Sequence, residues 1–210
     1  MSRPPVRHDM VKRDAVSHDT VEALVDRAQQ ELPYRNAAFT QLVTRFHPRV
    51  FRMAAHYLGN EADAEEATQE TFVRVHHALP GFDHRATFTT WLYRIVYNVC
   101  ATLYGKRKRR LEGRRDLAQR ERGATQNVEA ADSSSRVEQE IVNRALQRLN
   151  ADDRALLGLR FVSELQVDEI AEVLEINQSA AKMRLARARE RFKEAFLEEG
   201  GAQDHGSGDG

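Results

Sequence analysis

Two short helical patterns, separated by a break, dominate the C-terminal part of the chain. In the first, apolar residues recur at i, i+3, i+4 and i+7, which gives one apolar helix face: Val167, Ile170, Ala171 and Leu174. The pattern breaks over residues 175–177, where Asn177 is a favourable N-cap for a second helix. The second helix has its own apolar face, made of Ala181, Leu185, Ala188 and Phe192. Two helices joined by so short a break predict a helix-turn-helix.

The second of these helices is strongly basic. Between Gln178 and Lys193, six Lys and Arg residues stand against one Glu, a net charge of +5. A basic helix that follows a short acidic one is typical of a helix-turn-helix whose second helix enters the major groove of DNA. The small residues 179–181 favour this interpretation because they allow the backbone to approach bases and phosphates closely. A surface helix with a solvated basic face is the alternative.

Helical periodicity also runs through the N-terminal half. A first helix is expected over about residues 20–31 and ends before Pro33. A longer apolar stripe follows, made of Phe39, Leu42, Val43, Phe46, Val50, Ala54 and Leu58. Pro48 lies inside this pattern and is expected to kink or split the helix. Gly59 and Asn60 then predict a C-cap and a turn.

The next expected helix begins with an acidic run and ends before Pro80. The run consists of Glu61, Asp63, Glu65, Glu66 and Glu70. Acidic side chains at a helix N-terminus complement the helix macrodipole, which is one explanation of the run. A basic partner surface is the other, because five acidic residues within ten exceed what helix capping needs. The pattern leaves both interpretations open.

A further amphipathic helix is predicted from Thr87 onward. Its apolar stripe consists of Phe88, Trp91, Leu92, Ile95, Val96, Val99, Cys100 and Leu103. Polar and aromatic residues off this stripe predict an exposed face suited to stacking on unpaired bases: Tyr93, Arg94, Tyr97, Asn98 and Tyr104. From Lys106 to Arg122, nine basic residues then stand against three acidic ones. Such a run either binds polyanions or forms a solvated linker.

These patterns predict an all-α protein with two small helical domains. The first spans residues 20–110, and the second spans residues 137–198, where two short helices precede the helix-turn-helix. Residues 111–136 form the expected flexible, charged linker, which would span roughly 25–30 Å as a coil and about 80 Å when extended. Residues 1–19 and 199–210 are polar ends that we expect to be disordered.

Composition narrows the classes of function. The formal net charge is zero, which conceals strong segregation of charge along the chain. No apolar run approaches the ~20 residues of a membrane span, and no secretory signal is evident, so no membrane insertion is expected. The single cysteine, Cys100, fits a reducing cytoplasm, where we expect the protein. The histidines lack metal-binding spacing and no phosphate-binding Gly-Lys loop occurs, so we expect no enzyme, no metal and no cofactor.

Three stretches, in this order, carry a likeness to known proteins: residues 63–74 (DAEEATQETFVR), residues 88–98 (FTTWLYRIVYN) and residues 167–191, which begin VDEIAEVL. Together they resemble an extracytoplasmic-function (ECF) sigma factor of bacterial RNA polymerase. The first stretch resembles the core-polymerase-binding helix of region 2. The second resembles the helix that melts promoter DNA and reads the −10 element. The third resembles region 4, which reads the −35 element.

The resemblance implies partners and roles for individual residues. A basic coiled coil of the largest subunit of core RNA polymerase would be bound by Asp63, Glu66, Gln69 and Glu70. An extruded −10 base would be captured, without any hydrolysis, by Arg85, Thr87, Trp91, Arg94, Tyr97 and Asn98. The phosphate backbone would be held by Lys106, Arg107, Lys108, Arg109 and Arg110. The −35 major groove would be read by Ser179, Lys182, Arg184 and Arg187. An anti-sigma factor that covers the polymerase-binding surfaces is implied as well.

The chain departs from the family pattern at the DNA-reading positions. The turn before the basic helix carries Glu175 where many relatives have glycine, and the helix opens with NQSAA in place of the commoner Pro-x-Gly-Thr-Val. The loop at residues 83–85 also differs from common versions, so neither promoter element can be read from the sequence. The alternative function is a free-standing helix-turn-helix regulator that binds operator DNA. That function gives the linker, the acidic helix and the aromatic helix no role.

Overall fold

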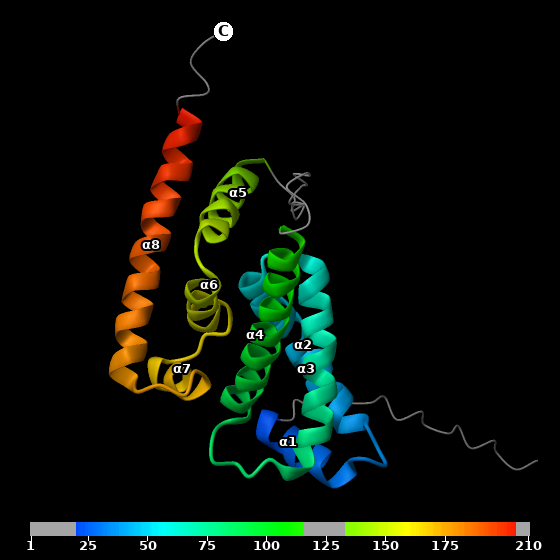
Figure 1. Ribbon diagram of the computed structural model, residues 1–210. Helices are drawn as coiled ribbons and strands as arrows, with labels where there is room; N and C mark the ends of the chain where they lie inside the picture. Colours follow the sequence, from blue (N-terminus) through cyan, green and yellow to red (C-terminus); the bar gives the residue numbers. More distant parts are fainter. Residues whose placement is uncertain (1–19, 116–132, 205–210) are drawn as a thin grey trace, which may run out of the picture.

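The computed structural model describes residues 20–115 and 133–204 of the chain, and these residues are largely helical (Figure 1). Neither segment contains a β-strand. The predicted all-α class is therefore confirmed. The two ends at residues 1–19 and 205–210, and the middle of the expected linker at residues 116–132, lie outside the described residues.

The N-terminal domain consists of helices α1 (Val21–Glu31), α2 (Ala37–Leu58), α3 (Glu61–Ala78), the 3₁₀ turn η1 (Leu79–Gly81) and α4 (Phe88–Arg115). Helix α2 contacts α1, α3 and α4, which makes it the centre of this domain. Its predicted apolar stripe is buried apart from Val43, which is partly buried. The periodicity of α2 therefore located the core of the domain correctly.

Pro48 does not split α2, contrary to one of the two outcomes expected for it. The helix is continuous from Ala37 to Leu58, and Pro48 lies on its exposed side. A proline in a helix interior removes one backbone donor and costs stability. Buried residues on both sides of it, including Phe46 and Val50, belong to the same apolar cluster and hold the two halves together.

The predicted turn between α2 and α3 is confirmed. Gly59 has a φ of 75°, in the left-handed region that favours glycine, and its N–H donates to the Ala55 carbonyl at 2.8 Å. Asn60 then caps α3, because its Oδ1 accepts a hydrogen bond from the Asp63 backbone N–H at 2.8 Å. The acidic run therefore begins at a well-defined helix start.

The C-terminal domain consists of α5 (Ser133–Arg148), α6 (Ala151–Leu157), the π-helical turn η2 (Gly158–Val162), α7 (Val167–Val173) and α8 (Gln178–Asp204). Helix α8 stands at the outer edge of the molecule, and the shorter helices lie between it and the N-terminal domain (Figure 1). α8 packs on α5, α6 and α7. The predicted helix-turn-helix corresponds to α7 and α8.

Side-chain caps fix the starts of α6 and α8. Asn150 and Asn177, both predicted as N-caps, accept hydrogen bonds from the backbone N–H groups of Asp153 at 2.8 Å and Ala180 at 2.7 Å. Glu175, in the turn between α7 and α8, has a φ of 54°. A residue with a side chain pays about 1 kcal/mol for this left-handed conformation, which gives a physical reason for the glycine found in related sequences.

Helices extend into the segments next to the expected linker and tail. α4 continues to Arg115, α5 begins at Ser133 and α8 continues to Asp204. Lys, Arg, Leu and Glu, which fill most of residues 106–115, are all strong helix formers, so α4 has no local reason to stop at residue 110.

The two domains share one continuous apolar cluster, to which both contribute buried residues. Tyr93 on α4 is its largest fully buried side chain, with 0% of its surface exposed. Its expected position on an exposed face of α4 is therefore wrong. Helix α7 of the C-terminal domain packs on α4, and Tyr93 lies close to Ser163 of that domain. The face of α4 that periodicity assigned to solvent is partly an interface between domains.

Candidate functional site

The acidic face of α3 carries the four residues that the resemblance implies for binding polymerase. They differ in exposure and in whether another side chain already contacts them. Glu66 and Gln69 are exposed. Glu70 is engaged by Arg74 one turn later, with Nε 2.7 Å from its Oε1. Asp63 is only partly exposed, since its Oδ2 accepts hydrogen bonds from Arg107 at 2.8 Å and from Asn60 at 2.7 Å. Of the three acids assigned to polymerase binding, Glu66 is therefore the one that a partner reaches most readily.

Replacing Asp63 with alanine is expected to lower the free energy of unfolding by about 1–2 kcal/mol, because it removes an acid from the helix N-terminus and the partner of Arg107. The free energy of unfolding should be measured by urea denaturation of the full chain. Glu66→Ala, on the same face of α3, is the matched control and should leave it nearly unchanged. An equal loss in both variants would contradict the structural role of Asp63.

The loop that leads into α4 is held at both ends. Phe82 is buried, and the Arg85 guanidinium lies 2.8 Å from the Asp83 carboxylate while remaining 89% exposed. Thr87 caps α4, because its Oγ1 accepts the Thr90 backbone N–H at 3.1 Å. The loop therefore presents Arg85 to solvent from a fixed position.

Trp91 closes an aromatic cluster at the start of α4. Its ring centroid lies 4.9 Å from that of Phe82 and 5.8 Å from that of Phe88. The indole is partly buried, so one part of it packs against the N-terminal domain while the rest remains accessible. This position allows both a packing role and a role in contact with a base.

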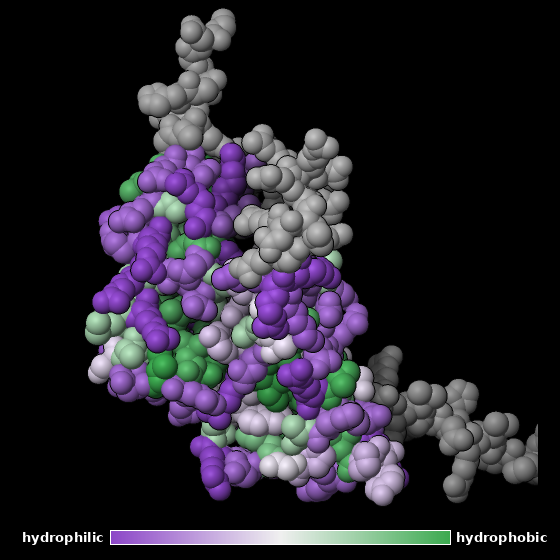
Figure 2. Space-filling view, viewed as in Figure 1, coloured by the Kyte–Doolittle hydropathy of each residue, from purple (hydrophilic) through white to green (hydrophobic). Residues whose placement is uncertain are grey.

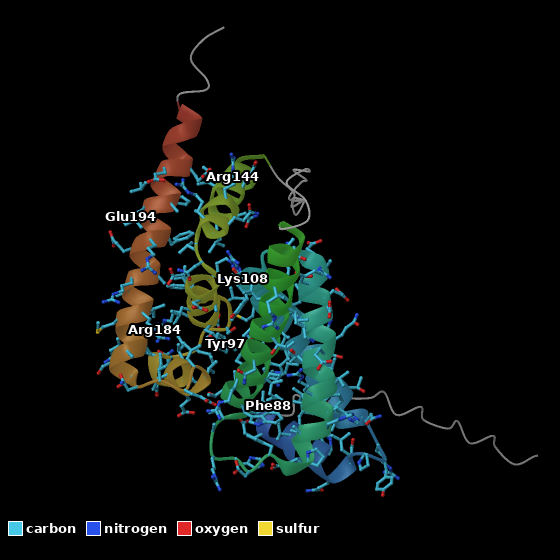
Figure 3. The ribbon with its side chains drawn as sticks, viewed as in Figure 1. Phe88, Tyr97, Lys108, Arg144, Arg184 and Glu194 are labelled. Carbon is cyan, nitrogen blue, oxygen red and sulfur yellow. The ribbon has the colours of Figure 1, made fainter. Side chains whose placement is uncertain are left out.

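Farther along α4, the polar candidate residues differ in how much they already contact other residues of the chain. Arg94 donates from Nη2 to the backbone carbonyl of Glu172 on α7 at 3.0 Å. Tyr97 packs edge-on against Tyr57, with centroids 5.6 Å apart, and burial raises the pKa of Tyr97, so its phenol stays protonated and can donate. Asn98 is exposed. Figure 3 shows Tyr97 on α4, on the side where the C-terminal domain lies.

The basic end of α4 combines exposed and paired side chains. Lys106, Lys108, Arg109 and Arg110 are exposed, whereas Arg107 reaches Asp63 across the α3–α4 contact. Lysine and arginine side chains in this arrangement suit contact with phosphates. Arg107 also links two sites that the sequence treated as separate, because its partner belongs to the acidic face of α3.

Helix α8 presents its four candidate residues to solvent together. Ser179, Lys182, Arg184 and Arg187 are exposed, while Ala181, Leu185 and Ala188 are buried on the opposite side. Arg191 anchors the helix to α6 through Asp153, with Nη1 2.6 Å from Oδ2. Asp153 itself is 5% exposed. The contact between Arg191 and Asp153 therefore fixes α8 against α6. Figure 3 shows Arg184 near the N-terminal end of α8.

Several contacts between the domains involve residues that the sequence did not single out. The Thr90 hydroxyl donates to the Glu169 carboxylate at 3.1 Å, and Arg154 donates from Nε and Nη2 to the Tyr57 carbonyl at 3.2 and 3.1 Å. Partners in these bonds are 79 and 97 residues apart in the chain. No local pattern could have indicated them, because periodicity reports only the residues of one helix.

Hydrophilic residues cover most of the visible surface, and apolar residues emerge only in separate areas (Figure 2). Across residues 20–115 and 133–204, no helix is both long and apolar enough to cross a membrane. Within the same residues, His, Cys, Asp and Glu side chains form no group that could hold a metal ion.

Comparisons with known proteins match both domains. The family model Sigma-70 region 2 matches residues 42–110, and the family model Sigma-70, region 4 matches residues 139–192. RNA polymerase sigma factor NccH of Alcaligenes xylosoxydans xylosoxydans is 34% identical over 171 residues, which cover 80% of this chain and 90% of that protein. ECF RNA polymerase sigma factor SigW of Bacillus subtilis is 27% identical over 163 residues, which cover 74% and 87%.

Solved structures share the fold. CnrH, in complex with the cytosolic domain of CnrY, superposes with a TM-score of 0.59 at 26% identity, over 81% of this chain and 93% of CnrH. The sigma factor RpoE from Bartonella quintana, in complex with the anti-sigma factor NepR, superposes with a TM-score of 0.60 at 21% identity, over 76% of this chain and 96% of RpoE. The second likeness, at its lower identity, concerns the fold alone.

Proposed function

The chain is an extracytoplasmic-function sigma factor of the sigma-70 family, and we propose that it divides promoter recognition between its two domains. Helix α3 binds core RNA polymerase, α4 holds the −10 element, and α8 reads the −35 element. The observation that carries this division is that Ser179, Lys182, Arg184 and Arg187 are all exposed in the first three turns of α8. As a sigma factor, the protein directs a polymerase and catalyses no reaction itself.

Binding to core polymerase is assigned to the acidic face of α3. Glu66 and Gln69 are open to a partner, and Glu70 can exchange its contact with Arg74 for one with a basic partner. Such an exchange costs little, because an exposed ion pair contributes only about 0–1 kcal/mol. Charge complementarity speeds association and excludes wrong partners.

Melting of the −10 element is assigned to the loop at residues 82–87 and to α4. Extruding a base from the duplex costs a few kcal/mol, which stacking and hydrogen bonds in a pocket can offset. Trp91 and Tyr97 supply aromatic surface, and Arg85, Thr87, Arg94 and Asn98 supply polar contacts. Stacking on an aromatic side chain is worth about 1–3 kcal/mol per base, which is similar in size to the cost of extruding the base.

Control by an anti-sigma factor is the remaining part of the proposed function. Family membership supports it. CnrH, which is 26% identical to this chain, was solved in complex with the cytosolic domain of another protein, CnrY.

Run-off transcription tests the proposed function. Purified protein would be mixed with bacterial core RNA polymerase and a library of genomic promoter fragments, with core alone as the control. Discrete transcripts that depend on the protein are expected, and the aligned upstream sequences should show two elements. The absence of such transcripts, together with failure to co-elute with core on gel filtration, would overturn the proposal and favour a free-standing DNA-binding regulator.

A further inference from the structure

The loop between η1 and α4, residues 82–87, contains neither helix nor strand. It carries Arg85 and Thr87, two of the residues assigned to the −10 element. Figure 1 shows α1 beside this loop at one end of the N-terminal domain, and α1 contacts both η1 and α4. The shape of the loop therefore depends on side chains that hold it from outside, and α1 is placed to supply them.

One side chain of α1 makes three hydrogen bonds to this region. Gln29 donates from Nε2 to the Leu79 carbonyl at 3.1 Å and to the Phe82 carbonyl at 2.8 Å. Its Oε1 lies 2.9 Å from Nε2 of His84. Carbonyl oxygens accept and cannot donate, so the amide nitrogen of Gln29 faces the two carbonyls and His84 donates to the amide oxygen. Both N–H groups and the oxygen of this amide are therefore engaged.

His84, in the middle of the loop, has an uncommon backbone conformation. Its φ is 59°, in the left-handed region that favours glycine. Such a conformation persists where the surrounding structure holds it, and residues of this kind gather at functional sites. The centroid of the His84 ring lies 4.6 Å from that of Phe82, and its Nε2 lies 3.7 Å from the Asp26 carboxylate on α1. Ring packing and Gln29 thus hold His84 from two sides, next to Arg85.

The contacts of Gln29 hold the loop rather than the fold of the domain. Leu79 and Phe82 are buried, so apolar packing already anchors the chain where it leaves η1. Residues 83–85, which follow, are exposed and depend on contacts such as the one between Gln29 and His84. These two residues are 55 apart in the chain, so no local pattern indicates the contact.

A loop held in one shape can distinguish between bases better than a loop that samples many shapes. Preference for one base is a difference in affinity, and it depends on where the donors and acceptors of the loop lie when a base arrives. A loop that must be ordered during binding also weakens the complex, because the loss of its conformational freedom opposes binding. Holding residues 83–85 in advance therefore favours both affinity and base preference.

We propose that Gln29 is a positioning residue for the −10 element: by holding the Phe82 carbonyl and His84, it fixes the loop that presents Arg85 and so sets which −10 base the protein prefers. Gln29 acts through the loop and not by contact with DNA. The proposal rests on the proposed function and adds a determinant of base preference on α1. Gln29 precedes residues 42–110, which the region 2 model matches, so that match implies no role for it.

Gln29→Leu in the full chain tests the proposal, because it removes the three hydrogen bonds and keeps a side chain of similar size. Gln30→Leu is the matched control, since Gln30 is the next residue of α1 and is exposed. NMR order parameters of the backbone N–H groups of residues 83–86 would be measured on the free proteins. Each protein would then be bound to core, and its affinity compared on promoters that differ in a single base of the −10 or the −35 element.

Order parameters of about 0.85, typical of rigid backbone, are expected in the wild type and in Gln30→Leu, with a fall below about 0.6 in Gln29→Leu. Gln29→Leu should also lose roughly 3–10-fold of its preference among −10 bases, the size expected when loop side chains must be ordered on binding. Its preference among −35 bases should stay unchanged. A variant that was merely less stable would instead bind every promoter more weakly by the same factor.

Unchanged order parameters in Gln29→Leu would show that Gln29 does not hold the loop and would overturn the proposal. A mobile loop with an unchanged −10 preference would overturn the link between the loop and base selection. If the wild type fails to bind core, the proposed function fails and the assigned base preference fails with it. The order parameters would still report whether Gln29 holds the loop, so the two failures are distinguishable.

Far-UV circular dichroism would establish that Gln29→Leu is folded. If it is not, Gln29→Glu replaces it, with Gln30→Glu as its control. The glutamate side chain has the same shape and keeps an acceptor for His84, but it has no donor for the carbonyls of Leu79 and Phe82. Losses of loop order and of −10 preference are again expected. Their absence in a folded Gln29→Glu protein would contradict the proposal.

Discussion

Replacing Glu66 with lysine is expected to weaken binding to core RNA polymerase by about 100-fold while leaving the fold intact. Glu66 is exposed near the middle of the acidic face of α3. Its neighbours Asp63 and Glu70 are already engaged by Arg107 and Arg74. A lysine at residue 66 would replace an attraction to a basic partner with a repulsion. Association should therefore be slower and dissociation faster.

The matched control is Glu22→Lys, the same charge reversal at an exposed position of α1 in the same domain. Affinity for core would be measured by titrating labelled protein with polymerase, and thermal unfolding would be followed in parallel. Glu22→Lys should bind core like the wild type. If a folded Glu66→Lys protein also binds like the wild type, the polymerase does not contact this face of α3.

Local chemistry made most of the helices predictable. Asn150 and Asn177 cap α6 and α8 as their positions indicated, and Gly59 ends α2 with a positive φ in the predicted turn. Apolar periodicity located the buried faces of α2 and α8 because each helix packs against its own domain along one stripe. These signals lie within a few residues of one another, which is the range over which a sequence can be read directly.

The predictions that the structure corrects depend on packing between segments that are distant in the sequence. Tyr93 lies off the stripe of α4 that packs on its own domain, so periodicity placed it in solvent. It is buried because a second domain, 70 residues farther along at Ser163, covers it. Pro48 was expected to kink or split α2, and the split does not occur, because buried residues on both sides keep the helix continuous. In both cases tertiary packing overrides the local signal.

The acidic run on α3 contains both a residue paired within the fold and residues that are exposed. The sequence left helix capping and partner binding as open alternatives. In the structure, Asp63 belongs to the capped start of the helix and pairs with Arg107, whereas Glu66 is exposed. Composition could not distinguish Asp63 from Glu66, because Arg107 lies on another helix, 44 residues away.

Replacing Arg184 with alanine is expected to cost about 1–3 kcal/mol of −35 binding, a loss of roughly 10–100-fold, and to relax base preference at one position. Arg184 is exposed on α8, about two turns beyond the capped start of the helix, while Leu185 beside it is buried. A guanidinium in that position can donate two hydrogen bonds to guanine, and alanine can donate none. The helix itself should persist, since alanine is a good helix former.

Arg110→Ala is the control for Arg184→Ala, because its exposed side chain at the basic end of α4 is assigned to phosphate rather than to a base. Both variants would be bound to core, and their affinities compared on promoters that carry single-base changes in the −35 element, at several salt concentrations. Arg110→Ala should weaken binding uniformly across these promoters and reduce the salt slope by about one. Arg184→Ala should instead reduce the differences in affinity among the promoters. If it lowers every affinity by the same factor, Arg184 contacts phosphate and the −35 preference must come from other residues of α8.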